Sequence, residues 1–248
     1  MSLDKNPFIN RPQFKHGAVP FDDIKLEHFI PALDYAIAEA EKNLESIKSN
    51  PESPTFDNTA LQMESGTELM DAVANTYFNL MSAESDNKFK ELAQDISPKL
   101  SAFKNKVLLD SKLFSRVKTL YENRDKDALT SEQKRLVEEK YTDFTLNGAL
   151  LNDADKKKVR KIDEELSKLS PKFSQNTLNA TNDFTYHTED EAELSGLPDM
   201  TKEQAAETAK KKKKDSGWMF TLQMPSYIPV MQYADNRELR KTLYKARS

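Results

Sequence analysis

The stretch LEHFIPALDYAIAEAEKNLESIKS, residues 26–49, sets the character of the whole chain. Its apolar side chains recur at steps of three and four residues, which places them on one face of an α-helix. Pro31 stands near the first turn, where its missing N–H does least harm, and Asn50-Pro51 ends the segment. The stretch predicts a long amphipathic helix that other helices must cover. Its apolar stripe consists of Leu26, Phe29, Ile30, Leu33, Ile37, Leu44 and Ile47.

Two similar patterns follow between residues 55 and 107. We expect one helix with Thr55 as its N-cap and another that opens at Ser85 and Asp86. Pro98 lies inside the second pattern, so we expect a kink or a split there. The inward residues are Phe56, Met63, Met70, Val73, Phe78 and Met81 in the first helix, and Phe89, Leu92, Ile96, Leu100, Phe103 and Val107 in the second.

Two more helices are expected before residue 149. One covers about 110–123, and the next follows Thr130, which forms a capping box with Gln133. Gly148 suits the C-terminal stop of that helix. The inward residues are Leu113, Phe114, Val117 and Leu120, and then Leu136, Val137, Tyr141 and Phe144.

The longest helix should begin near Asn152. Its apolar residues repeat at 3-4-3-4 spacing, which is also the spacing of a coiled coil. The repeat lasts only two heptads and meets Pro171, whereas a coiled coil sustains ~3–4 heptads. We therefore predict a long helix in the core of a helical bundle. The repeat consists of Val159, Ile162, Leu166, Leu169 and Phe173.

The character of the sequence changes after Thr181. Two short alternating segments, Phe184-Tyr186-Thr188 and Trp218-Phe220-Leu222, predict strands that pair as an antiparallel ribbon. A helix is expected between them over about 201–213. The lysine run at 210–214 suits the end of that helix, because cations favour the helix C-terminus and no aromatic residues are interleaved for nucleic acid.

A last helix is expected after Asp235, with Asp235 as its cap and Glu238 three residues later. Only two or three turns follow before Ser248. From this abrupt stop we expect the chain to be a piece of a longer protein. We also expect an exposed apolar patch that would favour self-association, formed by Trp218, Phe220, Met224, Tyr227 and Met231.

Composition excludes several classes of protein. The 248 residues carry 37 basic and 41 acidic side chains, so the net charge of -4 argues against a general nucleic-acid binder. No apolar run approaches the ~20 residues of a membrane span, and residues 1–8 lack a secretory signal. Five scattered glycines leave no phosphate-binding loop, and the absence of cysteine excludes thiol catalysis and Cys-ligated metals.

No catalytic, cofactor-binding or metal-binding residue can be assigned from the pattern. The three histidines, His16, His28 and His187, are not spaced to share a metal, and we interpret each as a surface or half-buried residue. The acidic string at 189–193 lacks the alternating ligands of a calcium loop and is interpreted as a helix N-terminus. No G-x-S-x-G elbow is present.

Eight stretches in order along the chain carry a family resemblance. They are NPF (6–8), VPFDDIKLEHFIPALDYAI (19–37), NPESPTFDNT (50–59), YFNLMSAESD (77–86), LFSRVKTLYENRD (113–125), LSPKFSQNTLNATN (169–182), ELSGLPD (193–199) and MPSYIPVMQYADNRELRKTLYKA (224–246). Together they resemble the N-terminal region of the thimet oligopeptidase family of zinc metallopeptidases. The first and last stretches look closest to the peptidyl-dipeptidase (dipeptidyl carboxypeptidase) branch, followed by oligopeptidase A.

The resemblance implies a mostly α, neurolysin-like helix bundle with one short two-stranded β ribbon. The residue patterns divide the chain into an extended arm at 1–25, a helical domain at 26–182 and a ribbon with helices at 183–248, and the resemblance implies that the last part leads into a missing catalytic domain. In the family, zinc is held by an HExxH helix and a downstream Glu, and the motif Glu is the general base. No His here is followed by Glu, so no site residue is carried over.

The resemblance therefore implies the channel-wall part of an enzyme that hydrolyses short, unfolded peptides and releases C-terminal dipeptides. We expect this chain alone to be inactive and to hold no zinc. Its expected partners are its own catalytic domain and peptides, with no nucleic acid and no membrane. The expected compartment is the cytoplasm, with the periplasm as the alternative for the complete protein. Two alternatives stay open: a natural stand-alone helical binding or scaffold module, and a helical adaptor unrelated to peptidases.

Overall fold

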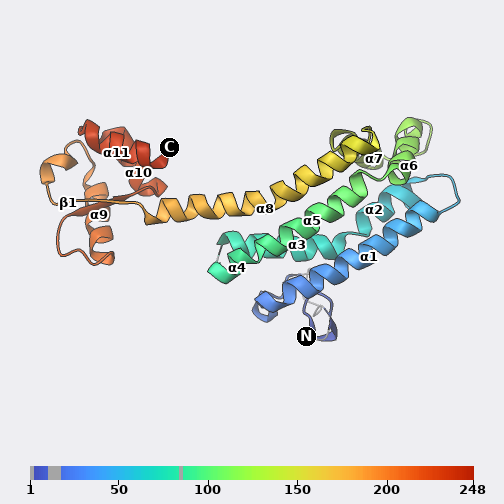
Figure 1. Ribbon diagram of the computed structural model, residues 1–248, viewed down its shortest axis with the longest axis horizontal. Coiled ribbons are helices and arrows are strands. Elements are labelled where there is room, and N and C mark those ends of the chain that lie inside the picture. The colour runs from blue at the N-terminus through green and yellow to red at the C-terminus, as the bar shows by residue number, and fades with distance from the viewer. Residues whose placement is uncertain (1–2, 11–17, 84–85) are drawn as a thin grey trace. The chain divides into compact units, whose positions relative to one another are not determined.

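The computed structural model describes residues 3–10, 18–83 and 86–248. It contains two compact units, Met1–Pro171 and Lys172–Ser248 (Figure 1). The boundary between the units lies inside helix α8 (Asp153–Asp183). The boundary expected from the sequence, between residues 182 and 183, stands at the end of the same helix.

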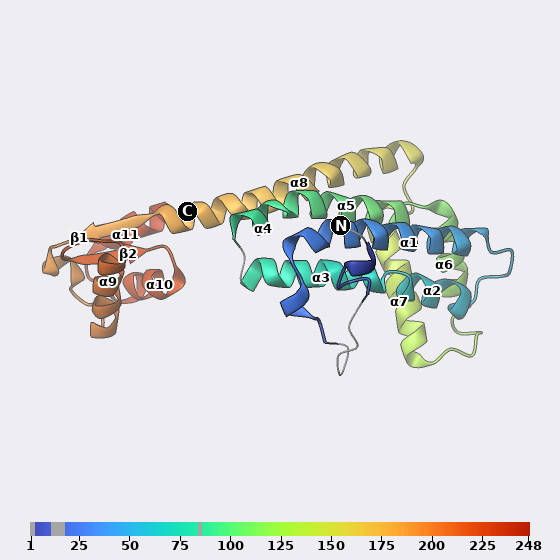
Figure 2. The ribbon, with the colours of Figure 1, turned by 90° about the horizontal axis from the view of Figure 1, so that it is seen from below.

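The first unit is built from helices alone within its described residues, so the prediction of a mostly α fold is confirmed. Helices α3 and α5 both run alongside α1 (Figures 1 and 2). The elements before α8 are η1 (Leu3–Lys5), η3 (Phe21–Asp23), η4 (Leu26–His28), α1 (Phe29–Ser49), η5 (Phe56–Leu61), α2 (Gln62–Ser65), α3 (Glu68–Ala83), α4 (Asn87–Glu91), α5 (Ala93–Leu108), α6 (Ser111–Asn123) and α7 (Ser131–Leu146).

Helix α1 supplies the centre of the first core. Phe29 is fully buried, and its ring lies 5.2 to 5.6 Å, between centroids, from the rings of Phe8, Tyr77 and Phe89. The Tyr77 hydroxyl donates a 2.6 Å hydrogen bond to the carbonyl of Phe89, so this buried polar group is satisfied. Leu33, Leu44 and Ile47 of the stripe are buried as well, and Leu26, Ile30 and Ile37 are half-buried, which confirms the predicted core face of this helix.

Asn6 attaches the N-terminal segment to α1. Its side chain is buried, its Nδ2 donates to the carbonyl of His28 at 2.9 Å, and its Oδ1 accepts from the backbone N–H of Phe8 at 3.0 Å. Phe8 is buried beside Phe29, whereas Phe21 is half exposed and anchors nothing. Phe14, His16 and Ser85 lie outside the described residues.

The helix expected after Thr55 is interrupted. Thr55 does cap its start, but the helix is interrupted at Gly66, between the end of α2 and the start of α3. At this break the side-chain amide of Asn43 on α1 donates to the carbonyl of Gln62 at 2.7 Å. A Cβ at Gly66 would collide with that amide, so glycine allows α1 to approach closely.

Of the two outcomes expected at Pro98, a kink or a split, the split does not occur. Helix α5 continues through Pro98, and the irregularity falls six residues earlier, at Leu92 between α4 and α5. Pro98 removes only the hydrogen bond to the carbonyl of Gln94, an exposed residue in the first turn of α5. Three further predicted ends are confirmed, because α6 begins after its cap Asp110, the Thr130–Gln133 capping box opens α7, and Gly148 follows α7 with a positive φ.

Helix α8 contradicts the prediction of a bundle-core helix. Its apolar stripe, which we define as Ile162, Leu166 and Leu169, is 51–56% exposed, and Phe173 at the next position is 72% exposed. Lys156 is the one described residue of α8 that is buried. The periodicity was therefore correctly interpreted as helical, but the face that it marks is not in the core.

The second unit contains the ribbon. Strands β1 (Thr185–Thr188) and β2 (Trp218–Thr221) pair antiparallel, as predicted, and Tyr186 lies opposite Phe220. Around the ribbon lie η6 (Glu191–Leu194), α9 (Asp199–Lys211), α10 (Met224–Tyr233) and α11 (Arg237–Arg247). The core of this unit contains Leu194, Leu197, Ala205, Phe220, Val230, Ala234, Leu239 and Leu243.

Two details of the second unit differ from expectation. Asn236, not Asp235, caps α11, because the Asp235 carboxylate accepts a 2.8 Å hydrogen bond from the Ser195 hydroxyl instead. Phe220 is fully buried, so the apolar patch expected around it is reduced to Met224, which is 49% exposed, with half-buried neighbours. None of the helices in the described ranges has the length and apolarity needed to cross a bilayer.

Candidate functional site

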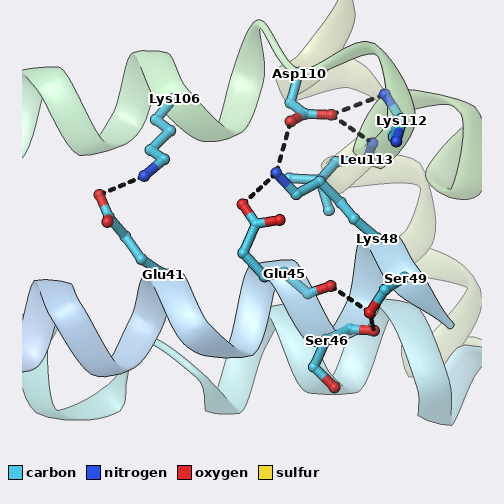
Figure 3. Close-up of polar contacts among 9 residues, drawn as sticks. All are labelled: Glu41, Glu45, Ser46, Lys48, Ser49, Lys106, Asp110, Lys112 and Leu113. Atoms are coloured by element: carbon cyan, nitrogen blue, oxygen red, sulfur yellow. Dashed lines mark hydrogen bonds and ion pairs between the residues drawn. The ribbon is translucent and has the colours of Figure 1, made fainter.

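A polar cluster joins the C-terminal end of α1 to the start of α6 (Figure 3). The Lys48 ammonium lies 2.6 Å from the Glu45 carboxylate and 3.2 Å from that of Asp110. The other oxygen of Asp110 accepts from the backbone N–H groups of Lys112 and Leu113 at 2.8 and 3.0 Å. Asp110 thus caps α6 and binds α1 at the same time.

The contacts within this cluster favour the charged forms of Lys48 and Asp110. The pKa of Lys48 is raised, chiefly because the ammonium donates a hydrogen bond to Glu45, with Asp110 also contributing against the cost of burial. Burial alone would raise the pKa of Asp110, but hydrogen bonds from Leu113, Lys48 and Lys112 outweigh it, so this pKa lies below its usual value. Both groups are therefore charged at neutral pH and are unsuited to proton transfer there.

Helix α8 contributes two further cations beside the cluster. Lys156 is 4% exposed, and its ammonium donates a 3.0 Å hydrogen bond to the hydroxyl of Ser111 at the start of α6. Arg160, one turn later, is exposed. Among the described residues, the Arg160 guanidinium forms no ion pair within 4 Å.

Two cavities flank this cluster, both lined by Asp110 and Arg160. The first, of about 420 Å³, lies between α5 and α8, and the second, of about 410 Å³, lies between α1, α6 and α8. Most of the residues that line the two cavities are charged or carry a hydroxyl. Such a lining can bind charged or hydrogen-bonding groups of a ligand, but it offers no activated nucleophile.

A third cavity, of about 460 Å³, is apolar. Helices α1, α2, α3, α5 and α7 contribute its lining, which includes Met63, Met70 and Phe103, and the exposed Lys104 and Asp143 lie at its edge. The sequence correctly placed the first three on inward stripes. It could not show that their packing leaves a hollow, because the cavity volume depends on how several helices meet rather than on any one pattern.

The two histidines that the structure describes, His28 and His187, do not form a site. His28 is buried and its Nδ1 accepts a 2.9 Å hydrogen bond from the backbone N–H of Lys25, so it stabilises the turn before α1. The Nε2 of His187 lies 2.8 Å from the carbonyl of Ser216. In the part of the chain that the structure describes, no three His, Cys, Asp or Glu residues are grouped as metal ligands.

The acidic string at 189–193 also has local structural roles. Asp190 caps η6 by accepting from the N–H of Ala192, as expected for a helix N-terminus. Glu193 accepts a 2.8 Å hydrogen bond from the hydroxyl of Tyr186, and Glu189 accepts one from Ser216. These carboxylates are therefore engaged in the second unit rather than grouped around a vacant centre.

The pattern of a known domain family, described as "Neurolysin/Thimet oligopeptidase, N-terminal domain", matches residues 29–156. The match covers just over half of the chain. The chain belongs to this family. The match runs from α1 to Lys156, so it contains the polar cluster and the residues that line the apolar cavity, and it confirms the resemblance carried by the eight stretches.

Curated relatives of this thimet oligopeptidase-family chain extend the similarity to nearly all of its length. Dipeptidyl carboxypeptidase of Escherichia coli is 31% identical over 97% of the chain and 35% of that protein. Oligopeptidase A of Haemophilus influenzae is 31% identical over 97% of the chain and 34% of that protein. A probable cytosolic oligopeptidase A of Arabidopsis thaliana is 29% identical over 99% and 35%. The chain thus spans about a third of the length of these relatives.

Proposed function

We propose that this chain is the N-terminal, channel-wall part of a zinc metallopeptidase that hydrolyses short peptides and releases dipeptides from their C-termini. One observation carries the proposal: 241 residues align at 31% identity with a protein named dipeptidyl carboxypeptidase. Oligopeptidase A aligns equally well, so internal cleavage of oligopeptides is the alternative form of the same peptidase function.

The residues of this chain do not fit a zinc site. No histidine is followed by glutamate, and the ring nitrogens of His28 and His187 described above already have backbone partners. In the proposed enzyme, the zinc and the general base therefore come from residues outside this sequence. No step of peptide hydrolysis is assigned to side chains of this chain.

The proposed role of this chain is to restrict and bind what reaches the catalytic part. A wall of packed helices admits short, unfolded peptides and excludes folded proteins. Its partners are the catalytic part of the same polypeptide and the peptides themselves, rather than nucleic acid or a membrane. We place the protein in the cytoplasm, with the periplasm as the alternative.

A second candidate function is a stand-alone helical binding module without catalysis. The apolar cavity of about 460 Å³, with Lys104 and Asp143 at its edge, favours it. The two candidates differ in what the gene encodes after Ser248, so one experiment separates them.

The test begins by sequencing the source gene past the codon for Ser248. The peptidase proposal expects an open reading frame that continues to an HExxH motif and a later glutamate. The complete protein should then release dipeptides in a reaction that chelators abolish, and the variant with Gln in place of the motif glutamate should not. The 248-residue chain should bind no zinc tightly and cleave no peptide. A stop codon directly after Ser248, or chelator-sensitive cleavage by the 248-residue chain, would contradict the proposal.

A further inference from the structure

Within the first unit, helix α8 packs against α5 and α6 with a polar face. Lys156 donates to the Ser111 hydroxyl, and the backbone carbonyl of Asp163 accepts a 3.4 Å hydrogen bond from the Ser101 hydroxyl on α5. Ser167, on the same side one turn later, is half-buried. The side of α8 that faces α5 and α6 thus carries lysine, aspartate and serine, and the half-buried Val159 lies at its border with the apolar stripe.

The apolar stripe of α8 lies elsewhere on the helix surface. At 3.6 residues per turn, Ile162, Leu166 and Leu169 are centred ~120° around the axis from the packed side. All three side chains are more than half exposed. An amphipathic helix normally buries its apolar stripe and exposes its charges. Helix α8 does the opposite, because its polar side faces α5 and α6 and its apolar stripe faces outward.

Such an arrangement needs a partner on the apolar side. Single exposed leucines are common, but three large apolar side chains in adjacent turns form a continuous patch, and such patches mark interaction surfaces. Charged residues of both signs, Lys158 and Glu165, lie along one side of the stripe and would form the polar rim of an interface there.

We propose that the apolar stripe of α8 is the surface on which the catalytic part of the same polypeptide docks. This inference rests on the proposed function, because it takes the catalytic part to exist. Relatives that align over 97% of this chain are about three times as long, so most of their residues lie outside the aligned region and are available to cover the stripe.

A second copy of this chain is the less suitable occupant. The regular spacing covers two heptads and then reaches Pro171, and coiled-coil pairing normally needs ~3–4 heptads. Packing against a larger apolar surface has no such length requirement, because ridges of side chains spaced three and four residues apart fit the grooves of a single neighbouring helix.

The test compares one double variant, Leu166→Gln with Leu169→Gln, in two contexts. In the 248-residue chain the variant should leave the thermal unfolding midpoint unchanged, because both side chains are exposed there. In the complete protein it should lower the midpoint by several degrees. It should also speed hydrogen exchange of the backbone amides at 159–170 by about tenfold or more. Glutamine keeps helix propensity, so loss of the helix itself is avoided.

Lys161→Gln is the matched control. Lys161 is exposed on α8 and lies ~110° from the stripe, so this change should have no effect in either context. Equal effects of the double variant in both contexts, or none in either, would overturn the proposal. So would a dimer of the 248-residue chain, seen by light scattering, that the double variant dissociates. If the complete protein cleaves peptides while residues 159–170 stay unprotected, the docking surface is wrong and the peptidase function stands.

Discussion

Helices α1 and α8 carry equally regular apolar stripes and have opposite environments. In α1 the side chains of Phe29, Leu33 and Ile47 are fully buried, and in α8 those of Leu166 and Leu169 are more than half exposed. The difference does not lie in spacing, since both stripes use steps of three and four residues. It lies in what the rest of the described chain offers: α3 and α5 cover α1, whereas α5 and α6 meet α8 on its polar side.

Periodicity therefore identifies a helix and the face that requires a partner, but it does not identify the partner. For α1 the partners are in the same unit, and burial is the main stabilising contribution. For α8 the stripe contributes little to the stability of this chain. Four substitutions test that contrast. The expected loss in the free energy of unfolding is largest for the first, at the centre of α1, and smallest for the last, in the stripe of α8.

Phe29→Ala should have the largest effect. Phe29 packs against three aromatic rings at the centre of the first core, so truncation leaves a cavity and should cost about 3–5 kcal/mol in the free energy of unfolding. Phe21→Ala is the matched control, because Phe21 is half exposed and its loss should cost less than ~0.5 kcal/mol. Denaturant titration of the 248-residue chain measures both. If Phe29→Ala does not fold, Phe29→Leu should fold with a smaller loss, and equal costs for Phe29→Leu and Phe21→Ala would contradict the assigned core.

Asn6→Ala should cost about 1–3 kcal/mol, because it leaves the carbonyl of His28 and the N–H of Phe8 without their buried partner. The change should also loosen the N-terminal segment from α1. Limited proteolysis within residues 3–10 should therefore accelerate. The matched control is Asn10→Ala, since Asn10 is exposed and its amide donates only a long 3.3 Å bond to Asp4. Similar proteolysis of both variants would show that Asn6 does not hold the segment.

Much of the fold could be predicted from the sequence, because its signals are local. Helix ends follow from side chains that bond within three residues, as for Thr55, Asp110 and the Thr130–Gln133 box. The interruption at Gly66 could not be predicted in this way. It depends on the approach of Asn43, which is 23 residues distant in sequence and close only after α1 and α2 pack.

The candidate site was less predictable than the fold. The family could be recognised because eight short stretches keep their order, and the absence of an HExxH motif is visible in the sequence. The cluster of Lys48, Asp110 and Lys156 could not be recognised, because three helices bring together residues that are individually unremarkable for a charged helical protein. Its chemistry exists only in the tertiary structure.

Asp110→Ala should cost about 0.5–2 kcal/mol, the usual range for a lost N-cap. Asp110→Asn should cost less, because asparagine caps well and only the attraction to Lys48 is lost. The pKa of Asp110 is lowered in the folded state, so the unfolded chain binds the proton first on acidification. The stabilisation by its charge is thus present above pH ~4, the unfolded-state value, and lost as the pH falls through the folded-state pKa.

Denaturant titrations from neutral pH to pH 3 measure this dependence. The wild-type chain should lose stability toward pH 3 more steeply than the Asp110→Asn variant, and the two curves should converge at the acidic end. Glu39→Gln is the control, because Glu39 forms an exposed pair with Lys42 on the same helix that carries Lys48. If the free energies of unfolding of wild type and Asp110→Asn change in parallel with pH, the charge of the Asp110 carboxylate does not stabilise the fold.

Leu166→Ala should have the smallest effect and is the sharpest test of the comparison. Truncation of Leu33 on α1 should cost about 2–5 kcal/mol, whereas the same truncation at Leu166 should change the free energy of unfolding by less than ~0.5 kcal/mol. The two leucines share residue type and helical setting, so only burial differs. Both are measured by denaturant titration of the 248-residue chain at two protein concentrations. A cost at Leu166 near that at Leu33 would mean that the stripe is already covered in solution, and if that cost grows with concentration, a second copy of the chain covers it.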